Sequence, residues 1–147
     1  MRTWALLVSD VTVLYVEDEI MIAIETAHLL ETLGFQSVHV AHNLRTAEEL
    51  AARAQYDFAL LDVNLGNGEC TADFGIALRE SGTQVVFVSG YCKSDLGARL
   101  GDFDFLEKPI LRDVLAQACL DLIEVNRLKK NRPHNKKPAN PRVRREF

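Results

Sequence analysis

The sequence predicts an α/β protein built around one five-stranded parallel sheet, with five helices on its two faces. Two observations indicate this class. Short apolar runs rich in β-branched and aromatic residues alternate with segments in which apolar residues recur at helical spacing, and this alternation is typical of parallel sheets. Each run is almost uninterruptedly apolar, as a strand covered on both faces should be. The commonest order for five such units is 2-1-3-4-5.

Five strands and five helices can be placed along the chain. The strands are expected at residues 11–16, 36–41, 58–61, 84–88 and 103–106. The helices are expected at residues 19–33, 44–53, 71–81, 94–100 and 110–128. Gly97 should make the fourth helix weak. Asp18 and Asn43 are candidate N-caps for the first two helices. Gly34 and Gly82 stand where a glycine is expected to end a helix.

Composition predicts a single globular domain outside the membrane. The chain has 147 residues, of which 48% are hydrophobic and 26% charged, enough for one buried core. No apolar run is long enough for a membrane helix, and the N-terminus lacks a signal-peptide pattern, so we expect a cytoplasmic protein. Cys70, Cys92 and Cys119 are an odd number without CxxC spacing, which argues against a disulfide framework or a zinc site.

Charge divides the chain into an acidic body and a basic tail. Of the 21 acidic residues, 20 precede residue 126, whereas nine of the 17 Lys and Arg residues follow residue 125. We therefore expect a folded domain at residues 1–128 and a flexible or loosely docked basic tail, which contains proline, at residues 129–147. Such a tail could bind nucleic-acid phosphates non-specifically. The acidic body argues against this role.

Polar residues follow four of the predicted strands directly. Glu17 and Asp18 follow the first strand, and Asp62 follows the third. Ser89 follows the fourth strand, and Lys108 lies just beyond the fifth. The carboxyl ends of parallel strands meet at one edge of a sheet, and ligands bind where the strand order reverses. In the order 2-1-3-4-5 this point lies between the first and third strands. The sequence therefore predicts one site in which these five side chains meet.

Three clustered carboxylates repel one another unless a cation lies among them. A set of oxygen ligands without His or Cys suits Mg²⁺. Asp62 and Asp18 are the predicted ligands, with Glu17 reaching the ion through water and the backbone carbonyl of Asn64 completing the set.

Lys108 and the Ser89 hydroxyl should face the same point as the metal. An ammonium, a hydroxyl and a metal around one carboxylate form a cradle for a phosphoryl group, which needs positioning and charge neutralisation. Asp62 is then the nucleophile that forms an acyl phosphate.

Four segments in this order resemble the receiver domain of two-component response regulators. They are Val16-Glu17-Asp18-Glu19, Leu61-Asp62-Val63-Asn64, Val88-Ser89-Gly90 and Glu107-Lys108-Pro109. The resemblance spans about residues 10–128 and implies a flavodoxin-like receiver fold. Residues 62–65 and 86–91 look like the stand-alone receivers nicknamed for their FATGUY motif.

The resemblance implies a role for each site residue. Asp62 would accept phosphate from a histidine kinase or a histidine phosphotransfer protein, and Glu17 and Asp18 would hold Mg²⁺. Ser89 would be the switch hydroxyl and Lys108 the signalling lysine. Phe105 or Tyr91 would be the switch aromatic. The protein would be no classical enzyme, because its activity would be limited to self-phosphorylation and autodephosphorylation. Its output would pass to another protein, whose identity the sequence does not give.

Other chemistries fit less well. The chain has neither the GxxxxGK[ST] stretch of a P-loop nor GxGxxG after its first strand, and it has no GxSxG of a serine hydrolase. Phosphatases of the haloacid dehalogenase type need DxDx[TV] after the first strand, which the segment beginning at Glu17 does not match. A receiver fold that serves as an adaptor without phosphorylation stays open as an alternative.

Overall fold

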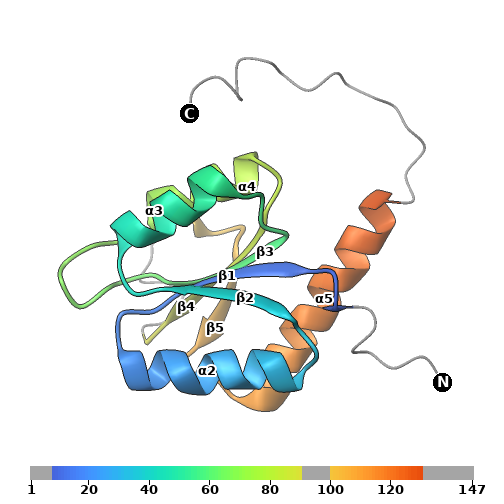
Figure 1. Cartoon of the computed structure of the whole chain (residues 1–147), viewed down its shortest axis with the longest axis horizontal. Coiled ribbons are helices and arrows are strands. Elements are labelled where there is room, and N and C mark those ends of the chain that lie inside the picture. The colour runs from blue at the N-terminus through green and yellow to red at the C-terminus, as the bar shows by residue number, and fades with distance from the viewer. Residues whose placement is uncertain (1–7, 91–99, 131–147) are drawn as a thin grey trace.

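A computed structural model of the chain describes residues 8–90 and 100–130 (Figure 1). Its centre is one five-stranded sheet in the order β2-β1-β3-β4-β5, in which all neighbouring strands are parallel. The strands are β1 (Thr12–Val16), β2 (Ser37–Ala41), β3 (Phe58–Asp62), β4 (Gln84–Ser89) and β5 (Asp104–Glu107). The predicted fold class and strand order are therefore confirmed.

Four long helices within the described residues cover both faces of the sheet. They are α2 (Ile20–Thr32), α3 (Leu44–Arg53), α4 (Ala72–Glu80) and α5 (Arg112–Lys130). The helices α2 and α5 lie on one face, and α3 and α4 lie on the other (Figure 1). The predicted helix at 94–100 and Tyr91 fall almost wholly outside the described residues. None of the described helices is long and apolar enough to cross a membrane.

The end of α5 differs slightly from the prediction. The helix continues to Lys130, two residues beyond the expected end, so the predicted boundary at residue 128 falls inside a helix. The remainder of the basic tail lies outside the described residues.

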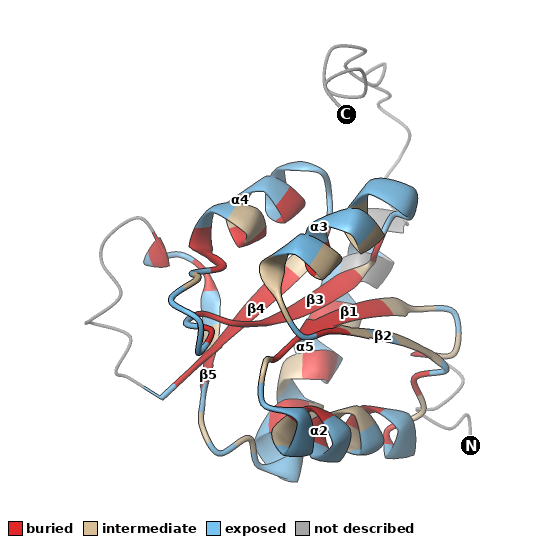
Figure 2. Ribbon diagram, turned by 60° about the vertical axis from the view of Figure 1, so that its left-hand side comes forward, coloured by how far each residue is buried: buried red, intermediate tan, exposed pale blue. Residues whose placement is uncertain are grey.

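Buried residues lie along the strands and on parts of the helices that cover the sheet (Figure 2), and they form two core clusters. On the α2/α5 side, Val13, Tyr15 and Leu60 pack with Leu30 and Leu115. The other side, covered by α3 and α4, has its own cluster, which includes Leu14, Val16, Leu61, Phe87, Ala47 and Leu78. Successive residues of a strand point to opposite faces, so the near-continuous apolar runs follow from the need to fill both clusters.

The helix ends show which local signals the structure uses. Asn43 caps α3 as predicted, since its side-chain oxygen accepts a hydrogen bond from the Thr46 N–H at 2.8 Å. Gly34 and Gly82 have φ values of 109° and 106° after α2 and α4, a conformation that glycine adopts without strain. The prediction that Asp18 caps α2 is wrong. Glu19 is the N-cap residue and makes no side-chain capping bond.

The substitution Gly75→Ala is expected to destabilise the fold. Gly75 is buried in α4, and a Cβ there would lie 2.8 Å from Cε1 of Phe87 and 3.1 Å from Cδ1 of Leu61. Overpacking of this kind costs about 1–3 kcal/mol, whereas alanine gains about 1 kcal/mol in helix propensity. The free energy of unfolding in urea should fall by up to roughly 2 kcal/mol. A rise, as propensity alone would give, would contradict this packing.

Candidate functional site

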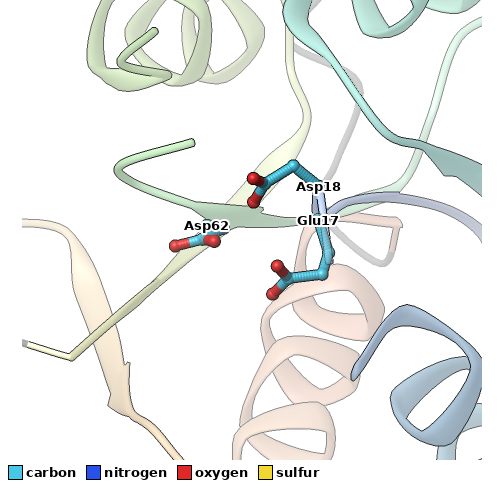
Figure 3. A group of neighbouring side chains, drawn as sticks. All are labelled: Glu17, Asp18 and Asp62. Atoms are coloured by element: carbon cyan, nitrogen blue, oxygen red, sulfur yellow. The ribbon is translucent and has the colours of Figure 1, made fainter. Parts of the chain in front are cut away.

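Three carboxylates gather where β1 and β3 end (Figure 3). Glu17, Asp18 and Asp62 each offer an oxygen, and these oxygens lie within 4.8 Å of one another. Glu17 and Asp62 are buried, with exposed fractions of 1% and 4%, and Asp18 is half-buried. The structure therefore brings together the three acidic side chains that the sequence assigned to one site.

Strand register explains why these side chains meet. Val16 pairs with Leu61 across β1 and β3, so the next residues, Glu17 and Asp62, are level at the edge of the sheet. Tyr15 lies two positions before Glu17 and belongs to the core cluster on the α2/α5 side. Because side chains alternate along a strand, Glu17 points to that same side, and the same reasoning places Asp62 there.

Lys108 supplies the positive charge of the site. Its Nζ lies 2.9 Å from Oδ2 of Asp62 and 3.2 Å from Oε1 of Glu17. The Lys108 N–H donates to the Ser89 carbonyl at 3.0 Å, and a cis peptide bond joins Lys108 to Pro109. The structure thus brings Lys108 into direct contact with two of the three carboxylates.

Burial dominates the electrostatics of the pair Glu17 and Asp62. It raises the pKa of both carboxyl groups above their ordinary values, and the nearby Lys108 ammonium lowers both pKa values in part. Burial alone would lower the pKa of Lys108, but its contacts with Asp62 and Glu17 outweigh that effect and raise the pKa. Three carboxylates against one ammonium leave an excess of negative charge, which a divalent cation would neutralise.

The metal-free protein is expected to become more stable as the pH falls from neutral. Burial raises the folded-state pKa of Glu17 and Asp62 above the unfolded values, so the folded state binds protons that the unfolded state does not. This stabilisation is complete below the unfolded pKa and is lost as the pH rises through the folded pKa. Urea midpoints in EDTA over roughly pH 5–8 would measure it.

A matched variant isolates these two groups in the pH experiment. In the double variant Glu17→Gln with Asp62→Asn, neither position titrates, so its midpoint should depend less on pH than that of the natural protein. The opposite result would be a urea midpoint that rises with pH over the whole interval, with the same slope in the natural protein and in the double variant. That result would contradict the assignment of the pH dependence to Glu17 and Asp62.

The loop after β3 fixes Asp18. The Gly66 N–H donates to Oδ2 of Asp18 at 2.7 Å. The buried Thr71 hydroxyl donates to the Asp62 backbone carbonyl at 2.8 Å. The sequence alone does not assign a role to Gly66 or Thr71, because both contacts depend on the path of the loop.

Adding a methyl group at Gly66 is expected to displace Asp18. The Cβ of Gly66→Ala would lie 2.5 Å from Oδ2 of Asp18, closer than two such atoms can approach. Magnesium affinity, measured by calorimetry, should fall by roughly 10- to 100-fold, as when a group that orients a ligand is lost. Gly90→Ala is a matched control, since its Cβ would have open space. An equal loss in both variants would contradict the role of the Gly66 contact.

Two further residues that the sequence assigned to the site, Ser89 and Asn64, lie near the ends of β4 and β3. Ser89 is buried at the end of β4 and follows Val88, which pairs with Asp62. Asn64 lies two residues after Asp62 and forms an isolated β-bridge with Cys70. The Asn64 side chain is exposed.

Phe105 is half-buried on the α3/α4 side of the sheet. Its ring stacks on Phe87 with the centroids 5.6 Å apart. Glu17 and Asp62 point to the α2/α5 side, so the aromatic pair and these two carboxylates lie on opposite faces of the sheet.

Oxygen donors at this spacing fit Mg²⁺. The cluster contains carboxylate oxygens alone, which are the ligands that this hard cation prefers. Oδ2 of Asp18 accepts the Gly66 N–H, so the other oxygen of this carboxylate can face the ion. Asp18, Asp62 and Glu17 are the side chains that would hold the ion.

Comparison with known proteins agrees with this geometry. The sequence profile of the response regulator receiver domain matches residues 13–120. The chain therefore belongs to the response regulator receiver family. No curated protein sequence matches the chain significantly.

Solved structures show the same fold. The solution structure of SdrG from Sphingomonas melonis Fr1 is 31% identical, with a TM-score of 0.67, and the match covers 77% of this chain and 96% of that one. A CheY-like receiver domain from Methylobacillus flagellatus is also 31% identical, with a TM-score of 0.67 and coverage of 76% and 98%. The BeF3-activated conformation of SdrG from Pseudomonas melonis Fr1 is 29% identical, with a TM-score of 0.67 and coverage of 84% and 99%.

Proposed function

We propose that the chain is a magnesium-dependent phosphoacceptor, in which Asp62 receives a phosphoryl group from a histidine kinase or a histidine phosphotransfer protein. One observation carries this proposal. The buried Asp62 carboxylate is flanked by an ammonium at 2.9 Å and by two further carboxylates. Repelling carboxylates are costly to bury, and their arrangement around one lysine suits a site that binds a cation and a phosphoryl group together.

The chemical step needs one nucleophile and a leaving imidazole. An oxygen of Asp62 attacks the phosphorus of a phosphohistidine, the P–N bond breaks, and its electron pair leaves with the imidazole, which takes a proton from solvent. The product is an aspartyl phosphate. Bound Mg²⁺ would neutralise charge on the phosphoryl oxygens, because such transfers depend on positioning and electrostatics.

Lys108 and Ser89 act on the phosphoryl oxygens. The Lys108 ammonium already contacts Asp62, so a small movement lets it pair with a phosphoryl oxygen. The Ser89 hydroxyl donates a hydrogen bond to another oxygen. Lys108 and Ser89 are joined through their backbones at 3.0 Å, so a shift of either residue moves the other.

The movement of Ser89 is the origin of the proposed output. Ser89 ends the strand that carries Phe87, and Phe87 stacks on Phe105 of β5. A shift at Ser89 therefore reaches the aromatic pair, and we place the protein-binding face at β5 and the helix that follows it. Activation of SdrG by BeF3, a phosphoryl analogue, supports a switch of this kind. The FATGUY-like motifs support a receiver of the single-domain type.

Phosphoryl uptake tests the proposal directly. The protein is incubated with Mg²⁺ and acetyl phosphate, and then with a panel of phosphorylated histidine kinases and phosphotransfer proteins. Intact-mass spectrometry should show one added phosphoryl group, which EDTA prevents. No uptake from any donor would favour a receiver fold that acts as an adaptor without phosphorylation.

A further inference from the structure

The loop between β3 and α4 is closed on itself by hydrogen bonds. The Leu65 N–H donates to the Glu69 carbonyl at 2.9 Å, and the Glu69 N–H donates to Oδ1 of Asn67 at 3.0 Å. An isolated β-bridge joins Asn64 to Cys70 at the two ends of this closed stretch. Because these bonds hold the loop together, a contact that fixes one of its residues also fixes the others.

Two contacts join this loop to other parts of the chain. On one side the Gly66 N–H donates to Oδ2 of Asp18 at 2.7 Å. On the other side Oε1 of Glu69 accepts a hydrogen bond at 3.1 Å from the N–H of Leu44, the first residue of α3. The pKa of Glu69 lies below its ordinary value, because the Asn67 side chain and the Leu44 N–H bind the charged form. Glu69 is thus a carboxylate at neutral pH and lies at a helix N-terminus, where negative charge is favoured.

The junction between β2 and α3, at residues 41–44, also contacts the end of β1. Nδ1 of His42 lies 3.0 Å from the Glu17 carbonyl, and because a carbonyl can only accept, the ring N–H is the donor. The Glu17 N–H in turn donates to the Ala41 carbonyl at 3.0 Å. The junction is therefore fixed relative to the acidic site, and it gives Glu69 a fixed point against which to hold the loop.

We propose that Glu69 is a positioning residue for the magnesium site, which acts by holding the loop against the start of α3. With the loop in this place, the Gly66 N–H reaches Asp18 and orients its carboxylate, so that the other oxygen faces the ion. The carbonyl of Asn64, a predicted ligand, belongs to the same loop. The role of magnesium rests on the proposed function, whereas the effect of Glu69 on Gly66 is a property of the metal-free protein.

Magnesium affinity, measured by calorimetry without a phosphoryl donor, tests the proposal. Glu69→Ala should weaken binding by about 2- to 10-fold, the change expected when one hydrogen bond is lost. Glu69→Gln removes the charge but keeps an acceptor oxygen, so it should retain most of the affinity. Glu49→Ala is the control for charge, because Glu49 lies in α3 in an exposed ion pair with Arg45, and it should bind as the natural protein does. No loss in Glu69→Ala, or an equal loss in Glu69→Gln or Glu49→Ala, would overturn the proposal.

A direct signal tests the same link in the metal-free protein. Glycine labelled with ¹⁵N reports each glycine N–H in NMR spectra, and the Gly66→Ala variant assigns the Gly66 signal. In Glu69→Ala the Gly66 proton signal should move upfield and exchange faster with water. The Gly82 signal should stay in place, because its N–H donates to the Arg79 carbonyl at 3.0 Å, away from the loop.

A second outcome separates this role from helix capping alone. A lower urea midpoint of Glu69→Ala with an unchanged Gly66 signal would mean that Glu69 only stabilises α3, and would overturn the proposal. If the natural protein binds no magnesium, the proposed function fails, and the Gly66 signal still decides whether Glu69 holds the loop.

Discussion

Asp62→Asn is expected to abolish phosphoryl uptake from acetyl phosphate and from every phosphorylated kinase that labels the natural protein. An amide oxygen is a poor nucleophile and cannot form a stable acyl phosphate. The change keeps the size of the side chain at a buried position, so the fold should survive. Intact-mass spectrometry after incubation with Mg²⁺ and donor measures the result, and circular dichroism confirms that the variant is folded.

A matched carboxylate at the other end of β3 provides the control. Oδ2 of Asp57 accepts hydrogen bonds from the Thr12 N–H at 2.9 Å and from the Thr12 hydroxyl at 3.0 Å. Asp57→Asn removes a charge just before β3 but leaves the acidic cluster intact, so it should be phosphorylated normally. A phosphoryl group on the Asp62→Asn protein would place the acceptor elsewhere and refute the assignment.

The fold was predictable because its signals are local or follow from general rules. Strands such as β3 (Phe58–Asp62) are buried along their whole length. A strand that is covered on both faces of the sheet needs apolar side chains on both faces, and this pattern is visible in the sequence. Gly34 and Gly82 end helices by adopting positive φ values. Right-handed crossovers then restrict the strand orders open to five such units, and the observed order is the commonest of them.

The site was predictable in its members but only partly in its contacts. Parallel strands end at one edge, so Glu17, Asp62 and Lys108 had to be near one another. The finer contacts depend on the paths of the loops, which no sequence pattern encodes. They include the shorter distance of Lys108 to Asp62 than to Glu17, and the hydrogen bond of Asp18 to Gly66 rather than to the start of α2. The Asp18 prediction failed because an N-cap is a common role for an aspartate before a helix, whereas here the Asp18 side chain accepts the Gly66 N–H in the loop after β3.

Lys108→Met is expected to lower the stability of the metal-free protein and to make the stability of the fold depend on magnesium. The change leaves the buried carboxylates Glu17 and Asp62 without the ammonium that lies 3.2 and 2.9 Å from them. Removing one partner of a fully buried ion pair costs about 3–5 kcal/mol. Because the Lys108 side chain is 25% exposed, we expect a smaller loss of about 1–3 kcal/mol in the free energy of unfolding in EDTA at neutral pH.

Magnesium should restore more stability to this variant than to the natural protein. A ligand that binds only the folded state stabilises it by mass action, and without Lys108 the ion no longer competes with an ammonium for Glu17 and Asp62. Urea unfolding with and without Mg²⁺ measures both effects. Arg45→Met is the control, because its ion pair with Glu49 is exposed and should contribute less than about 1 kcal/mol. Equal losses in the two variants, unaffected by Mg²⁺, would show that Lys108 does not neutralise the buried cluster.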